Sequence, residues 1–166
     1  MKLAGKHEFS APPREVYSRL LDPALLRQCM PGCERLEAVG DDRFELTVGV
    51  PVPAIKGEFS GTVEIVDQAP PESFGMKIEA TGKSGFVSAD ARMRIEPNGS
   101  TSIVHYEADA QIGGPAASVG QRVLTGISRR QVAQMMVCLE AGQRRLSLRA
   151  RILAWFRAKF QRGRGG

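Results

Sequence analysis

Residues 73–110 read SFGMKIEATGKSGFVSADARMRIEPNGSTSIVHYEADA, and this stretch decides the fold. It contains three runs that alternate apolar and polar residues: 73–81, 86–96 and 102–110. A two-residue period is typical of strands with one buried face. Glycines at 82 and 85, and Pro-Asn-Gly-Ser at 97–100, supply turns between the runs. Because consecutive strands joined by short turns pair side by side, the stretch predicts an antiparallel meander.

Strand-like runs also precede this stretch. They are Lys2–Phe9, Glu34–Val39, Arg43–Val50 and Ile55–Asp67. Between the first two, Ser10–Glu15 is typical of a capped helix start with proline at the first helical positions, and it predicts a short helix through Leu21. Asp22-Pro23 starts a second short helix, which we expect to end at Pro31-Gly32.

The period of the apolar residues changes after Gly113-Gly114-Pro115. Apolar residues then recur three and four apart, as on one face of a helix: Val119, Val123, Leu124, Ile127, Met135, Cys138 and Leu139. This pattern predicts one long C-terminal helix that ends or bends around Gly142. The predicted fold class is therefore α+β, with a curved antiparallel sheet of about six or seven strands wrapped around the long helix and two short helices after the first strand.

The predicted inward faces of the strands change from large side chains to small ones. Phe74 and Met76 share a face with Ala80, for example, and other strands repeat this gradient. Since protein interiors are close-packed, small residues opposite a helix indicate either close approach of the helix or a cavity. Gly120 and Gly126 on the helix support close approach. We favour the cavity, whose apolar lining predicts a lipophile.

The candidate ligand-binding residues are those predicted to face this cavity. They are Phe59, Val63, Phe74, Met76, Ile78, Ala89, Met93, Val104, Tyr106, Ala108, Val123, Ile127, Gln131 and Met135. Among the polar side chains nearby, we expect Tyr106, Gln131 and Thr81 to orient a hydrophobic small molecule by hydrogen bonding.

Residues 144–166 are at once strongly basic and strongly apolar. Of the chain's 23 lysines and arginines, eight lie here, so residues 1–143 carry 15 basic residues against 18 acidic ones. On a helical wheel most of the apolar residues fall on one arc, which is typical of a helix lying on an anionic membrane surface. The candidate membrane-binding residues are Arg149, Ile152, Trp155, Phe156, Arg157, Lys159 and Phe160. The run is too short and too charged to span a bilayer, which needs about 20 mostly apolar residues.

The sequence thus divides into a ligand-binding domain, residues 1–143, and a basic amphipathic tail, residues 144–166. Because the first residues hold no leader-like apolar run, we expect a cytoplasmic protein attached peripherally to the inner face of the cytoplasmic membrane. Other interpretations of the tail stay open: a helix docked on its own domain, a docking helix for a protein partner, or a disordered basic tail. We expect no nucleic acid as partner, because the domain offers no basic face with interleaved aromatic residues.

Three cysteines, Cys29, Cys33 and Cys138, form an odd set. We expect them to be reduced thiols in a cytoplasm. The spacing of Cys29 and Cys33 would suit a metal site or a redox pair. We expect neither, because the two histidines, His7 and His105, both lie in strand-like sequence.

Acid–base chemistry in the cavity would draw on His7, His105, Glu79 or Asp90. Strand alternation places His105 and Glu79 opposite the apolar residues, facing solvent. The sequence holds no Ser-His-Asp order, paired-carboxylate motif or phosphate loop. We therefore expect no catalysis. Two alternatives remain: a cyclase- or hydrolase-type enzyme acting on an apolar small molecule in the same cavity, and a pure membrane adaptor without a ligand.

The order of the predicted elements resembles the START-like helix-grip (SRPBCC) superfamily, which includes polyketide cyclases. More narrowly, five phrases resemble the family of carbon monoxide dehydrogenase G subunits, and together they cover roughly residues 1–140. They are Cys29–Glu34, Lys56–Gly61, Pro70–Phe74, Tyr106–Gly114 and Gly120–Leu124.

This resemblance implies a non-catalytic accessory protein of a molybdenum-containing CO dehydrogenase or a related molybdenum hydroxylase. It implies that the protein holds this enzyme complex at the cytoplasmic membrane and connects it to the quinone pool. The expected occupant of the cavity is then a quinone or another lipophile, with no covalent cofactor. The chain departs from many relatives in that its basic tail follows the domain directly, without a long linker.

Overall fold

The computed structural model describes residues 1–50, 52, 53, 55 and 57–161, with side chains as far as Gly142. Within these residues it shows a seven-stranded antiparallel sheet and three α-helices, which confirms the predicted helix-grip fold. The strands are β1 (Lys2–Phe9), β2 (Cys33–Gly40), β3 (Arg43–Gly49), β4 (Glu58–Ala69), β5 (Ser73–Gly82), β6 (Gly85–Asn98) and β7 (Thr101–Gly113). The helices are α1 (Pro13–Leu20), α2 (Pro23–Cys29), the short 3-10 helix η1 (Pro115–Val119) and α3 (Gln121–Gln161).

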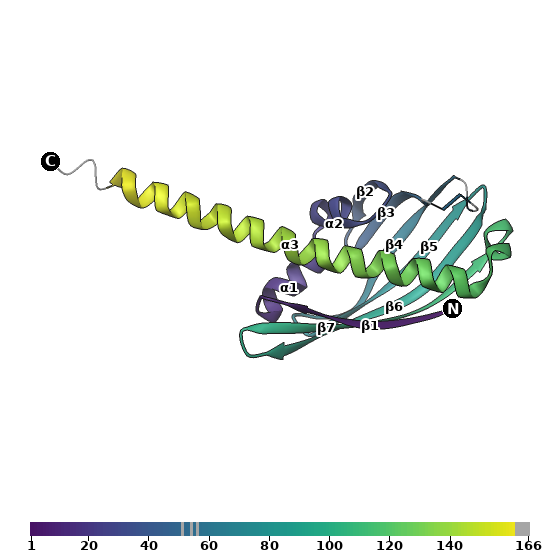
Figure 1. Cartoon of the computed structure of the whole chain (residues 1–166), viewed down its shortest axis with the longest axis horizontal. Coiled ribbons are helices and arrows are strands. Elements are labelled where there is room, and N and C mark those ends of the chain that lie inside the picture. Colours follow the sequence, from purple (N-terminus) through teal and green to yellow (C-terminus); the bar gives the residue numbers. More distant parts are fainter. Residues whose placement is uncertain (51, 54, 56, 162–166) are drawn as a thin grey trace.

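The strand order across the sheet is β1-β7-β6-β5-β4-β3-β2. Strands β2 to β7 therefore form the predicted meander, and the first strand pairs with the last, with Gly5 opposite Tyr106. The curved sheet wraps around one side of α3, and α1 and α2 lie toward the end from which α3 projects (Figure 1). A cavity can therefore form in the space between the inner face of the sheet and α3.

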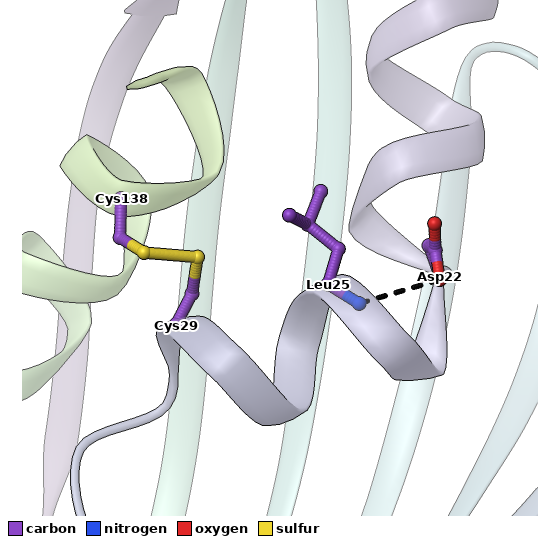
Figure 2. Close-up of a disulfide and its surroundings, with 4 residues drawn as sticks. All are labelled: Asp22, Leu25, Cys29 and Cys138. Carbon is purple, nitrogen blue, oxygen red and sulfur yellow. Dashed lines mark hydrogen bonds between the residues drawn. A yellow bond between two sulfur atoms is a disulfide. The ribbon is translucent and has the colours of Figure 1, made fainter. Parts of the chain in front are cut away.

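The two short helices begin differently. Helix α2 begins where the sequence predicted, at Asp22-Pro23, and Asp22 is its N-cap. The Asp22 Oδ1 accepts hydrogen bonds from the backbone N–H of Ala24 at 3.0 Å and from that of Leu25 at 3.3 Å, the second of which is drawn in Figure 2. The predicted cap of α1 is wrong in one respect, because Pro12 occupies the N-cap position and supplies no side-chain hydrogen bond. Pro13 is the first residue of α1, in agreement with the predicted proline at the first helical positions, since its fixed φ already matches a helix.

The sequence predicted that the long helix would either end or bend around Gly142. Helix α3 does not end there but continues to Gln161. Gly142 serves a different purpose. A β-carbon at this position would come 2.8 Å from Leu25 Cδ1, so the glycine allows α2 to pack closely against α3. The last part of α3 extends away from the sheet (Figure 1).

Cys29 at the end of α2 forms a disulfide with Cys138 on α3, with Cα atoms 5.4 Å apart (Figure 2). Cys33 is the free thiol. The expectation of three reduced thiols is therefore wrong. The reason lies in the fold, which brings together two residues that are 109 positions apart in the sequence.

Two clusters of buried side chains fix the helices to the sheet. The larger includes Phe9, Phe74 and Leu139, none of them more than 1% exposed. The smaller includes Phe59 and Leu124. Leu124 and Leu139 are about four helical turns apart on α3, so the helix is held to the sheet at two separate places.

Candidate functional site

A cavity of about 420 Å³ lies between the inner face of the sheet and α3. Small-molecule sites in proteins commonly measure about 300–1,000 Å³, so this volume suits a small ligand. The strand residues around it include Leu3, Leu36, Phe44, Phe59, Val63, Phe74, Met76, Ile78, Ala89, Met93, Tyr106 and Ala108. From α3 the lining includes Leu124, Ile127, Ser128, Gln131, Val132, Met135 and Leu139. The lining is almost wholly apolar.

Small side chains gather where β6 and β7 pair. Ala89 lies opposite Ala110, and Ala91 lies opposite Ala108. All four line the cavity, and they form an alanine floor on the inner face of the sheet. The two-residue period of the strands produces this floor, because the intervening residues, such as Asp90, point to the other face.

The glycines of α3 and of the turn before it do not mark close approach of helix and sheet. A β-carbon built at Gly126 or Gly120 would meet no described atom within 4 Å. Close approach does occur inside the sheet, where a β-carbon at Gly61 would come 2.5 Å from the Cα of Ala80. The space between sheet and α3 is thus a cavity, and the close-approach interpretation is wrong.

The structure places almost all predicted ligand-binding residues along the cavity. The residues in place are Phe59, Val63, Phe74, Met76, Ile78, Ala89, Met93, Tyr106, Ala108, Ile127, Gln131 and Met135. Val104 is a correction: it is fully buried in the larger core cluster and does not line the cavity. Val123 is a second correction, since it is 49% exposed on α3 while its neighbour Leu124 faces inward.

The sequence prediction missed one side of the cavity wall. Leu26 and Met30, on and just after α2, line the cavity, and so do Phe44, Leu46 and Val48 of β3. A signal for the β3 residues was present, because they alternate with polar neighbours just as the predicted residues do. No comparable signal marks α2, since a short helix with apolar residues can cover any part of a core.

Three side chains, those of Tyr106, Ser128 and Gln131, give the cavity polar groups. Glu107 also borders it, but strand alternation points its side chain to the other face of the sheet. Tyr106, on β7, lies over Gly5, where any β-carbon would collide with the tyrosine ring. Ser128 and Gln131 face the cavity from α3. Within the described part of the chain, neither the Tyr106 hydroxyl nor the Gln131 amide has a hydrogen-bond partner. Both can therefore bind a polar atom of a ligand. Thr81 is a correction: it is exposed and does not line the cavity.

The candidate acid–base groups lie outside the cavity. His105 contacts Glu96 at 2.8 Å on the outer face of the sheet. Glu79 accepts a hydrogen bond of 2.6 Å from Ser88 on that same face, as strand alternation predicted. Asp90 also lies on the outer face. His7 points toward α3, where its Nε2 lies 2.8 Å from Glu140 Oε2, and it too is absent from the lining.

Titratable groups with a displaced pKa also lie elsewhere. Burial raises the pKa of the Tyr17 hydroxyl, with a smaller contribution from Asp42. Burial likewise raises the pKa of the Cys33 thiol. A hydrogen bond with Glu58 raises the pKa of the exposed Glu34 carboxyl. None of these groups lines the cavity.

No helix among the described residues combines the length and the apolar character needed to cross a bilayer. The predicted membrane-binding positions, from Arg149 to Phe160, belong to α3. Their side chains fall outside the described ones, so the surface that they form stays a prediction.

Comparison with known proteins gives a family and a set of related folds. The sequence profile of the family of carbon monoxide dehydrogenase G subunits (CoxG) matches residues 5–142. No curated protein matches the chain. A conserved protein from Geobacillus kaustophilus is similar in structure, with a TM-score of 0.82, 28% identity, and coverage of 86% of this chain and 94% of that one.

Two further solved structures share the fold at low identity. A START superfamily protein from Mycobacterium smegmatis has a TM-score of 0.70 at 15% identity, with coverage of 87% of this chain and 98% of that one. The di-domain ARO/CYC StfQ from the steffimycin biosynthetic pathway has a TM-score of 0.66 at 12% identity, with coverage of 84% and 49%. At such identities the similarity is one of fold alone.

Proposed function

The chain belongs to the CoxG family of carbon monoxide dehydrogenase G subunits, and from this premise we propose that it is a non-catalytic accessory protein of a molybdenum-containing CO dehydrogenase or a related hydroxylase. In this proposal the cavity holds a lipophile, a quinone. The tail attaches the protein, and with it the enzyme, to the inner face of the cytoplasmic membrane.

The observation that carries the proposal is the apolar cavity with its few polar groups. A quinone ring and isoprenoid chain match apolar walls, because burial of apolar surface contributes roughly 25 cal/mol per Å². The quinone carbonyls need only a donor or two, which the Tyr106 hydroxyl and the Gln131 amide can supply. The alanine floor leaves room for a flat ring against the sheet.

The continuity of α3 supports the second half of the proposal. The helix that contributes Ile127, Gln131 and Met135 to the cavity wall continues into the basic, apolar tail. A tail that lies on anionic lipid would therefore hold the cavity close to the membrane, where quinones are dissolved.

The non-catalytic part of the proposal is supported by the positions of the acid–base groups. His105, Glu79 and Asp90 lie on the outer face of the sheet, and His7 contacts Glu140 rather than the cavity. If an enzymatic role held instead, purified protein would convert an apolar substrate, and the change Tyr106→Phe would lower the turnover number.

Extraction of bound lipid from protein purified from its native host tests the proposal. We expect a quinone at close to one molecule per chain. The variant Ala89→Phe fills the alanine floor and should lose the quinone, whereas Ala4→Phe, on the exposed face of β1, should keep it. A chain that carries no quinone or other lipid but still binds anionic liposomes would be a pure membrane adaptor.

A further inference from the structure

The Cys29–Cys138 disulfide lies at the boundary of the cavity. Cys29 ends α2, and Cys138 lies on the part of α3 that faces it (Figure 2). Neither sulfur lines the cavity, but residues next to both cysteines do. Leu26 and Met30 line it on the α2 side, and Met135 and Leu139 on the α3 side. The bond therefore joins two walls of the same cavity.

Apart from this bond, α2 is held by apolar packing: Leu25 and Cys29 are buried in the larger core cluster, and Leu26 packs against that cluster. The helix has only seven residues, too few to be a stable helix by itself. Asp22 bounds it on one side with an extended backbone, and Gly32 follows on the other with a φ of +76°. The chain changes direction at both positions. Gly32 is tied to β3, because the Gly49 N–H donates to its carbonyl oxygen at 2.8 Å. Against α3, Leu25 packs closely over Gly142.

We infer that the Cys29–Cys138 disulfide is a redox-controlled clamp, which holds α2 against α3 when oxidised and lets α2 open the cavity when reduced. The inference rests on the proposed function for the identity of the cavity's occupant. A dithiol reductant supplies the two electrons and two protons: one of its thiolates attacks a sulfur of the bond, and its second thiol resolves the mixed disulfide. The products are two free cysteines and an oxidised reductant.

At the cytoplasmic face of the membrane, the thiol reductants of the cell would set the redox state of such a clamp. Thiol reductants keep most cytoplasmic disulfides open, and those that form there are usually transient or redox-sensing. The oxidised protein would hold its lipophile, and the reduced protein would exchange it.

Hydrogen exchange tests the clamp without any ligand. The full-length protein is compared before and after reduction with tris(2-carboxyethyl)phosphine, and amide exchange in residues 23–30 is followed by mass spectrometry. We expect roughly tenfold or faster exchange in the reduced form, since local opening sets the exchange rate. Cys138→Ser should exchange at the fast rate with or without reductant. Cys33→Ser keeps the disulfide, and its exchange should respond to reductant as that of the wild-type protein does.

Ligand release provides the second measurement. Protein loaded with 1-anilinonaphthalene-8-sulfonate is mixed with excess decylubiquinone, and the loss of fluorescence is timed. We expect release about tenfold faster after reduction.

Equal α2 exchange rates in both redox states, or three titratable thiols in protein purified without reductant, would overturn the clamp. Faster α2 exchange with no binding of either probe would uphold the clamp and count against the proposed cargo. If the probes bind but are released at the same rate in both redox states, the disulfide does not control the cavity, and the proposed quinone ligand still stands.

Discussion

Leu25 of α2 lies directly against Gly142 of α3, four residues along each helix from the disulfide between Cys29 and Cys138. The two helices are thus held at two successive turns, once by close packing and once by a covalent bond. Gly142 also lies two residues before the basic tail, which begins at Arg144. The contact between α2 and α3 therefore connects the cavity wall to the start of the tail.

Replacing Gly142 tests how closely the two helices pack. Alanine in place of a helical glycine contributes up to about 1 kcal/mol to stability through helix propensity. At Gly142 this gain is offset, because the new methyl group must displace the Leu25 side chain. Gly126→Ala is the matched control, since a β-carbon there meets no described atom. Urea denaturation should show Gly126→Ala more stable than Gly142→Ala by about 1 kcal/mol. Equal gains would mean that α2 does not pack closely on α3.

The disulfide should contribute measurably to stability. It closes a loop of about 109 residues, and native disulfides typically contribute 2–4 kcal/mol. We expect reduction, or the change Cys138→Ser, to lower the free energy of unfolding by about this amount. The control is Cys33→Ser, which removes the free thiol and should leave the dependence on reductant unchanged. A denaturation midpoint that is the same with and without reductant would contradict this prediction.

The alternation of residues along the strands was enough to predict the sheet and most of the cavity. Ala89 and Ala108 were placed correctly, because parity alone decides which face of a strand a residue occupies. Val123 was placed wrongly, since one residue changes the direction of a helical side chain by about 100°. The pairing of Cys29 with Cys138 and the role of Gly142 depend on how α2 meets α3. No local pattern encodes such a long-range contact.

Tyr106 should contribute a hydrogen bond to a quinone in the cavity. Its hydroxyl has no partner among the described residues, so removing it breaks no hydrogen bond among them. We expect Tyr106→Phe to weaken binding of decylubiquinone about fivefold, the equivalent of about 1 kcal/mol. The matched control is Tyr17→Phe, whose hydroxyl donates to Gln68 Oε1 at 3.1 Å outside the cavity. Fluorescence titration would measure both variants, and equal affinities would exclude Tyr106 as the donor.

The tail should bind anionic membranes through its aromatic residues as well as through its charge. We expect Trp155→Ala combined with Phe156→Ala to abolish co-sedimentation with liposomes that contain anionic lipid, because the apolar face would no longer reach the acyl chains. Val123→Ala combined with Val137→Ala removes exposed apolar residues from the same helix within the domain, and should leave binding unchanged. Binding should also weaken as salt screens the arginines. Unchanged sedimentation of the tail variant would contradict an apolar face inserted among acyl chains, since charge alone would then account for the attraction.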